Sequence, residues 1–231
     1  MHNLSRQLSA DFKVVVIHSN NIIDQEVERV WQEELTRTNG KVFNEQLLAF
    51  DAFEGQVLTG HFVEYKSYIA QIRGGKGGIK PVSISGYCRA GNYVLVGKRS
   101  QQVTDYSGFY ELVPSGSIDP SSMNENSIDV TKQVRTELLE EAGIGAGLVK
   151  GVVATHLIEC VNEGVYEICC RVEVDEQVLG RELKGNGDGE YTELNWIEKS
   201  EIGKFVEKNM GMIVPLSLEL IEIELNIKSL P

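Results

Sequence analysis

The chain has 231 residues, 42% of them hydrophobic and 24% charged, a composition typical of globular proteins that argues against a disordered or fibrous class. Its formal net charge of −12 argues against a nucleic-acid-binding surface, because polyanionic backbones are held by clustered Lys and Arg. No apolar stretch approaches the roughly 20 residues of a membrane helix, and the N-terminus lacks a signal-peptide pattern. We therefore expect a cytoplasmic protein without a nucleic-acid or membrane partner.

The first third of the chain mixes strand-like runs with one helical pattern. Residues 24–36 carry apolar side chains at helical spacing, which predicts a helix. The glycine-rich residues 74–78 lack P-loop spacing and are expected to form a turn. We predict that residues 1–80 form an N-terminal α+β extension packed on a main domain at 81–231. Four runs rich in β-branched and aromatic residues predict strands: 12–18, 46–53, 60–72 and 82–88.

The remainder of the chain intermingles strands and helices. Gly143 is well placed to end the first of the helices. This alternation predicts a layered α/β or α+β fold. Short apolar runs predict strands at 93–97, 110–113, 152–160, 166–174 and 194–197. Apolar residues at helical spacing predict helices at 127–142, 200–208 and 215–227.

The predicted helix at 127–142 carries an unusual group of acidic residues. At about 100° per residue, Glu137, Glu140 and Glu141 lie within one helical face, while Val134 and Leu138 form a neighbouring apolar stripe. Three like charges at this spacing repel one another, and a hard divalent cation with oxygen ligands would remove that cost. The alternative is a solvated acidic face, which is common in so acidic a chain.

The residues around this helix resemble a known family. Residues 137–144 read E-U-x-E-E-x-G-U, where U is aliphatic, and Gly116 precedes them in a Pro-Ser-Gly turn. Both features are similar to the signature of the Nudix hydrolases, G-x5-E-x7-R-E-U-x-E-E-x-G-U. The late strand at 193–197 and the helix after it also resemble that family. The resemblance implies a Nudix-like α/β/α sandwich with a mixed β-sheet and, from the order of elements before it, an N-terminal extension of the sugar-nucleotide type.

Two departures from the family signature affect the loop before the helix. The family arginine falls on Thr136, and Arg135 stands one position early, about 100° round the helix. The loop from Gly116 to Glu137 also carries about six extra residues, rich in Asn and Ser, so the first signature glutamate has no counterpart at its usual spacing. These changes leave the geometry of the loop open, while the carboxylate half of the signature is intact.

The resemblance also implies roles for individual residues. Glu137, Glu140 and Glu141 would be the catalytic metal ligands, binding Mg²⁺, with Mn²⁺ as the alternative. Arg99, at the end of a predicted strand, would contact the substrate phosphates, although a surface cation is the competing interpretation. Gly116 would contribute to substrate binding. The general base stays open among several acidic residues: Glu137, Glu159, Glu163, Glu190 and Glu193.

Two functions follow from this reading. The first is a Mg²⁺-dependent hydrolase that cleaves the pyrophosphate of a nucleoside diphosphate linked to another group, such as a nucleotide sugar or ADP-ribose. The second is a non-catalytic module of the same fold that binds a nucleotide, which the altered loop and Thr136 favour. The expected partner in both is a small nucleotide, and homodimer formation is left open.

Overall fold

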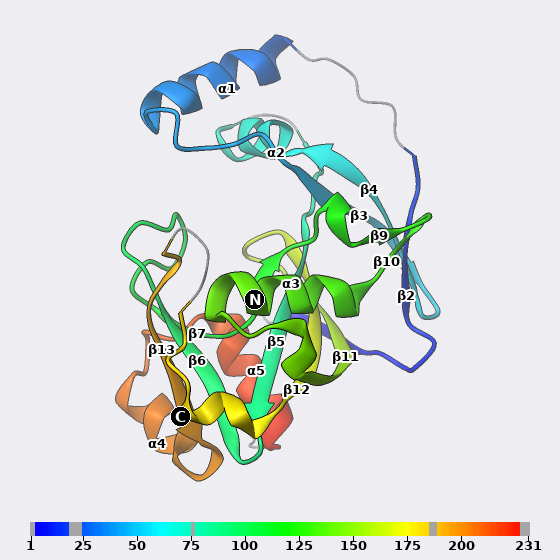
Figure 1. Cartoon of the computed structure of the whole chain (residues 1–231). Coiled ribbons are helices and arrows are strands. Elements are labelled where there is room, and N and C mark those ends of the chain that lie inside the picture. The colour runs from blue at the N-terminus through cyan, green and yellow to red at the C-terminus, as the bar shows by residue number, and fades with distance from the viewer. Residues whose placement is uncertain (1–2, 19–24, 75–76, 185–188, 227–231) are drawn as a thin grey trace. The chain divides into compact units, whose positions relative to one another are not determined.

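The chain forms two compact units in the computed structural model shown in Figure 1, which describes residues 3–18, 25–74, 77–184 and 189–226. The first unit combines the chain up to Ser83 with residues 117–129 and 158–167. The second unit contains residues 84–116, 130–157 and 168–231. The expected division into an N-terminal extension at residues 1–80 and a main domain at residues 81–231 remains a prediction.

The first unit contains a five-stranded mixed sheet with the strand order β3-β4-β2-β10-β9. Strands β2 and β4 run parallel, whereas the β3–β4, β2–β10 and β9–β10 pairs are antiparallel. The buried residues of β2, Val14 and Val16, alternate with less buried ones, as expected for a strand with one face in a core. The strands of this unit are β1 (Leu4–Gln7), β2 (Lys13–Val16), β3 (Gln46–Glu54), β4 (Val57–Glu64), β9 (Met123–Asn124) and β10 (Ser127–Ile128).

Two helices of the first unit, α1 (Gln25–Arg37) and α2 (Tyr65–Ile72), pack through an apolar cluster centred on Trp31 and Ile69. The helix expected at 24–36 is confirmed as α1, and residue 24 lies outside the described residues. The strand expected at 60–72 is wrong beyond Glu64, where α2 begins. Tyr65 and Ile69 are one helical turn apart, and burying that stripe against α1 decides in favour of the helix.

The extra residues of the loop before the acidic helix form a hairpin of the first unit. A 3₁₀ turn at Pro120–Ser122 leads into β9, and Glu125 (φ 55°) lies in the tight turn to β10. Strand β10 pairs with β2, Ser127 opposite Val15 and Ile128 opposite Val14. The helix start expected at residue 127 is therefore wrong, because residues 127–128 are used for strand pairing and α3 (Val130–Ala142) begins afterwards.

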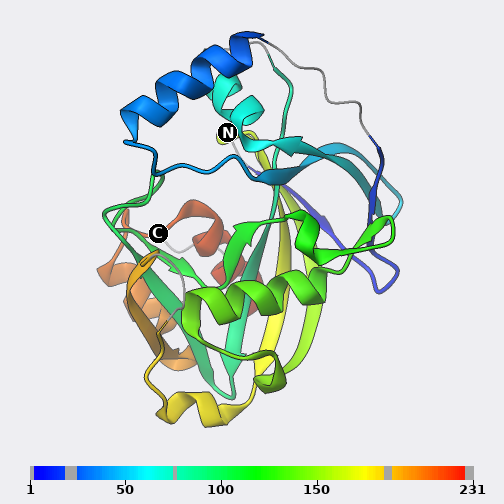
Figure 2. The same ribbon diagram turned by 45° about the horizontal axis from the view of Figure 1, so that its top comes forward.

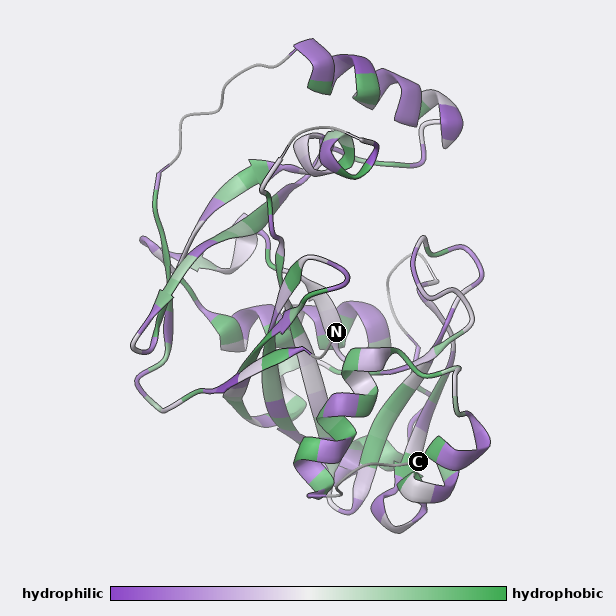
Figure 3. Ribbon diagram, turned by 180° about the vertical axis from the view of Figure 1, so that it is seen from behind, coloured by the Kyte–Doolittle hydropathy of each residue, from purple (hydrophilic) through white to green (hydrophobic). Residues whose placement is uncertain are grey.

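The second unit is a sandwich of helices on a sheet. Within this unit the strand order is β11-β12-β5-β6-β13, with β7 paired to β6 and β8 paired to β5. Helix α3 lies on one face of this sheet and α5 (Pro215–Leu225) on the other, as the opposite views of Figures 1 and 3 show. The strands are β5 (Val82–Ala90), β6 (Tyr93–Arg99), β7 (Tyr110–Leu112), β8 (Ser115–Ser117), β11 (Val149–Cys160), β12 (Val165–Val174) and β13 (Tyr191–Glu198).

The remaining expected elements of this unit are present. Helix α4 (Ile202–Lys208) follows a 3₁₀ turn at Lys199–Glu201. Helix α5 ends at Leu225, and residue 227, where the expected helix ends, lies outside the described residues. Further 3₁₀ turns lie at Ala146–Leu148 and Glu176–Gly180. No helix among the described residues has the length and apolar character needed to cross a membrane.

Helix α3 is held on the sheet by its apolar stripe. Val134 and Leu138 are fully buried, as their spacing of one turn predicts. Gly143 ends the helix in the left-handed region (φ 68°), and its N–H and that of Ile144 donate to the carbonyls of Leu139 and Leu138. Helix α3, drawn in green in Figure 2, is thereby fixed in its rotation on the sheet.

Candidate functional site

Four carboxylates of the second unit come together beside α3, and we call them the acidic cluster: Glu111, Glu137, Glu141 and Glu190. Glu137 and Glu141 come from α3, Glu111 from β7, and Glu190 from the residue before β13. The guanidinium of Arg99 and the hydroxyl of Tyr191 bind members of the cluster. The site therefore joins residues that are as far apart as positions 99 and 191 in the sequence.

Glu141 is the most confined member of the cluster. Only 7% of the residue is exposed, and its carboxylate accepts from the backbone N–H of Ser115 at 3.2 and 3.3 Å. Burial raises the pKa of Glu141 well above its ordinary value, and the charges of Glu190, Glu137 and Glu111 raise it further. Glu141 also lies in the last turn of α3, where the helix dipole disfavours a negative charge.

Glu137 owes its position to Gly116. A Cβ atom at Gly116 would lie 2.4 Å from Cδ of Glu137 and 2.5 and 2.6 Å from its two carboxylate oxygens, so the missing side chain makes room for this carboxylate. From the other side, Nε2 of the buried Gln133 donates to Oε1 of Glu137 at 2.7 Å. The glycine of the Pro-Ser-Gly turn thus brings backbone against the acidic helix.

Arg99 makes its bonds to carboxylates of the cluster. Its Nη1 donates to Oε1 of Glu111 at 2.6 Å and to Oε1 of Glu190 at 3.2 Å, and its Nε donates to the carbonyl oxygen of Asp105 at 3.1 Å. Burial lowers the pKa of Arg99, but the charges of Glu111 and Glu190 outweigh it and hold that pKa above its ordinary value. The phosphate contact expected of Arg99 remains a prediction; in this structure the side chain is the counter-ion of two acids.

Tyr191 reaches the cluster because of an irregularity in β13. Tyr191 pairs with Arg99 and Glu193 with Lys98, so Thr192 is an extra residue that shifts the register. Adjacent residues of β6 point to opposite faces, and Glu193 bonds Lys98 at 3.3 Å on its face. The bulge therefore places Tyr191 on the other face, with Arg99, although it is only two residues from Glu193.

The other residues singled out from the sequence are only partly members of this cluster. Glu140 is exposed, and its expected role as a metal ligand remains a prediction. Among the candidates for the general base, Glu137 and Glu190 belong to the cluster, whereas Glu193 is on the opposite face of β13. Glu159 and Glu163 belong to the first unit, where Glu159 is bound to Lys80 at 2.8 Å.

The donor set of the cluster fits a hard divalent cation. Its ligating atoms are carboxylate oxygens, which Mg²⁺ and Mn²⁺ prefer. Buried Glu141 faces three further acids, while Arg99 binds two of the four, so the remaining repulsion calls for a proton or a cation. As the side chains lie, no three His, Cys, Asp or Glu residues in the described part of the chain are already arranged around a metal position. A cation would therefore draw the carboxylates together.

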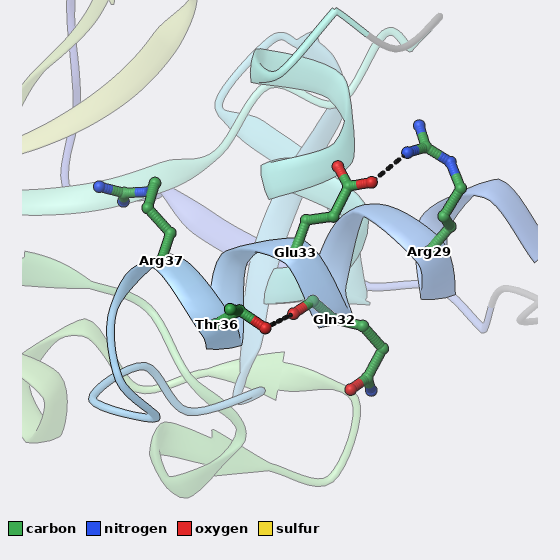
Figure 4. Close-up of a pocket in the computed structure, with 5 residues that line it drawn as sticks. All are labelled: Arg29, Gln32, Glu33, Thr36 and Arg37. Carbon is green, nitrogen blue, oxygen red and sulfur yellow. Dashed lines mark hydrogen bonds and ion pairs between the residues drawn. The ribbon is translucent and has the colours of Figure 1, made fainter.

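A separate surface hollow lies along α1 in the first unit and carries none of these acids. Figure 4 shows its lining side chains, all of which come from that single helix. Arg29 and Glu33 are paired one turn apart, and the hydroxyl of Thr36 donates to the carbonyl of Gln32 at 2.9 Å. These are ordinary contacts of an exposed helix, so we assign no ligand to this hollow. The lining residues are Arg29, Gln32, Glu33, Thr36 and Arg37.

Two members of the site were not expected from the sequence. Glu111 lies in the short strand β7, and the sequence of this strand does not indicate that Glu111 is buried in an ion pair with Arg99. Its position upstream of the Pro-Ser-Gly turn, separated from Pro114 by Leu112 and Val113, is the signal that could have marked it. Tyr191 had no such signal, because regular alternation would have placed it on the face of Glu193.

Comparisons with known proteins give structural similarity alone. No protein-family model matches the sequence, and a search of curated proteins finds no match. Tm1382, "a putative Nudix hydrolase", has a TM-score of 0.53 with this chain at 17% identity, and the match covers 85% of this chain and 96% of Tm1382. DR0079 from Deinococcus radiodurans has a TM-score of 0.51 at 11% identity, covering 78% of this chain and 98% of its own.

A third similar structure is a bifunctional NMN adenylyltransferase/ADP ribose pyrophosphatase from Francisella tularensis, complexed with AMP and a Mn ion. Its TM-score is 0.51 at 12% identity, and 69% of this chain is covered. The matched region spans 45% of the length of the Francisella protein. At these identities the likeness establishes the fold, and it confirms the predicted α/β/α sandwich with a mixed sheet.

Proposed function

Because the chain has the Nudix fold, we propose that it is a divalent-cation-dependent hydrolase that cleaves the pyrophosphate of a nucleoside diphosphate linked to another group. The observation that carries this proposal is the acidic cluster, where buried Glu141 meets three further carboxylates at the end of α3. A helix that serves only packing has no need of this arrangement, because the carboxylates repel one another and lie at the helix end where the dipole disfavours negative charge. The Mn ion and AMP bound by the similar Francisella protein support a cation and a nucleotide as ligands.

The chemistry is substitution at phosphorus. Water attacks one phosphorus atom of the pyrophosphate and the bridging P–O bond breaks. One product gains the hydroxyl and the other the remaining proton, which gives a nucleoside monophosphate and the phosphorylated second group. Charge spreads over the phosphoryl oxygens in the transition state, so the protein contributes mainly position and electrostatic stabilisation. A bound Mg²⁺ or Mn²⁺ would neutralise that charge.

Residues of the acidic cluster and the adjoining turn have separate roles in cation binding and proton transfer. Glu137, Glu141 and Glu140, the residue before Glu141 at the end of α3, would hold the cation through their carboxylate oxygens. Gly116 keeps the backbone close to Glu137, and so fixes where that carboxylate lies. Glu190, whose side chain is 40% exposed, is open enough to accept a proton from an attacking water and is our choice of general base.

A hydrolysis assay with and without a divalent cation tests this proposal. Nucleotide sugars, ADP-ribose and dinucleotides are incubated with the chain and Mg²⁺, Mn²⁺ or EDTA, and release of nucleoside monophosphate is measured. We expect cation-dependent turnover that falls at least a hundredfold in Glu141→Gln and is unchanged in Glu207→Gln, an exposed residue of α4. Full activity in Glu141→Gln would contradict the proposal.

The non-catalytic alternative predicts a different result in the same experiment. The loop departures that motivate it are offset, because the extra residues are ordered as a hairpin paired to β2. A nucleotide that binds tightly but is never cleaved with either cation, across the whole panel, would favour the binding module over the hydrolase.

A further inference from the structure

We propose that Tyr191 is a positioning residue of the acidic cluster, whose hydroxyl sets the placement of Glu111 relative to Glu141 and thereby the affinity of the cluster for a divalent cation. This inference rests on the proposed function, since it concerns the same site. It goes further by assigning a role to a residue that carries no charge and does not belong to the acidic helix.

The ring of Tyr191 packs against Gly97, where the sheet carries no side chain. A Cβ atom at Gly97 would lie 2.4 Å from Cδ1 and 2.6 Å from Cε1 of Tyr191, so the ring occupies the space that a side chain at Gly97 would fill. The same Cβ would lie 2.9 Å from Cγ2 of Val113, which borders this space. The bulge at Thr192 turns the side chain of Tyr191 toward the space beside Gly97, which is a residue of β6.

The hydroxyl of Tyr191 lies between two carboxylates that belong to different elements. It donates to Oε1 of Glu111 in a short bond and lies 3.4 Å from Oε1 of Glu141. Arg99 holds the same oxygen of Glu111 at 2.6 Å. Glu111 is therefore fixed by two donors on one oxygen, and Tyr191 links it to the acidic helix.

The energetic consequence follows from the burial of both acids. Glu111 is 4% exposed and Glu141 7% exposed, so neither can exchange the tyrosine for bulk water. Without the hydroxyl, two like charges would face each other across a buried gap and move apart. Partners that orient metal ligands in this way typically change cation affinity by about 10- to 100-fold when they are removed.

Titration with Mn²⁺ alone, followed by the electron paramagnetic resonance signal of free Mn²⁺, tests this role without a substrate. Tyr191→Phe keeps the ring and removes the hydroxyl, and Tyr93→Phe is the matched control, since Tyr93 is an exposed residue of β6. Gly97→Ala is a second variant that keeps the hydroxyl but displaces the ring. Thermal unfolding without metal shows whether each variant is folded.

We expect Tyr191→Phe to weaken Mn²⁺ binding about tenfold, Gly97→Ala to weaken it in the same direction, and Tyr93→Phe to bind as the wild type does. Wild-type affinity in folded Tyr191→Phe would overturn the role of Tyr191 while leaving the proposed hydrolase intact. Absence of Mn²⁺ binding in the wild type would overturn both, and so the two failures are distinguishable.

Discussion

Replacing Gly116 by alanine should separate the function of the site from the stability of the fold. The new Cβ would lie 2.4 Å from Cδ of Glu137, whereas ordinary contacts begin at 3.4 Å. The carboxylate must therefore retreat by about 1 Å, the difference between these two distances. Because the obstructing atoms are the end of a flexible side chain, the cost in stability should stay below about 1 kcal/mol. A displacement of this size in a catalytic group can reduce turnover by about a hundredfold.

The assay compares hydrolysis and thermal unfolding of Gly116→Ala with those of Gly203→Ala. Gly203 lies in α4, where an added Cβ meets no atom within 4 Å, so this control adds a methyl group without a clash. We expect Gly116→Ala to lose activity by about 10- to 100-fold with little change in the unfolding midpoint. Wild-type activity in Gly116→Ala would refute the argument that this glycine positions Glu137.

Two predictions concern stability and pH. The raised pKa of Glu141 means that this residue favours the folded state below its unfolded pKa and disfavours it as pH rises through the folded value. Glu141→Gln should therefore raise the unfolding midpoint of the metal-free protein at pH 8, and a lower midpoint would contradict the buried repulsion. Glu34, 4% exposed and bound by Arg37 and Arg73, has a pKa lowered to about 2 by these hydrogen bonds. Its stabilisation is present above the ordinary value of 4.5 and lost as pH falls through about 2. Because both arginines are half-exposed, we expect Glu34→Gln to cost about 1–2 kcal/mol at pH 7, with a difference that vanishes near pH 2 in denaturant titrations. A difference that does not depend on pH would contradict the ion-pair assignment.

The parts of the fold that follow local patterns were predictable from the sequence. Helix α3 has an apolar stripe at Val134 and Leu138, a stop at Gly143 and flanking strands of ordinary β composition. These features depend on residues within a few positions of each other, which is why sequence periodicity captures them.

The errors arose where distant contacts decide the local structure. Residues 65–72 have enough aromatic and β-branched character for a strand, but packing on Trp31 makes them helical. The sequence pattern predicts too early a start for α3, because Ser127 and Ile128 pair with β2, more than a hundred residues earlier in the chain. Neither partner can be identified from a single sequence.

The candidate site was predictable in its acidic helix and its glycine but not in its surroundings. The spacing of Glu137 and Glu141 and the turn at Gly116 are visible in the sequence. By contrast, the pairing of Arg99 with Glu111 depends on the register of β6 and β7, and Tyr191 depends on the bulge at Thr192. Strand register and bulges change which face a side chain occupies, and composition does not encode them.

The most direct test of cation binding by the acidic cluster is a crystal of the wild-type chain soaked in Mn²⁺ and measured for anomalous scattering. We predict a Mn²⁺ peak bound by carboxylate oxygens of Glu137 and Glu141, at roughly the 2.0–2.2 Å expected of a hard cation of this kind. A Mn²⁺ peak confined to exposed acids elsewhere on the chain, with the acidic cluster still free of metal at saturating Mn²⁺, would contradict it.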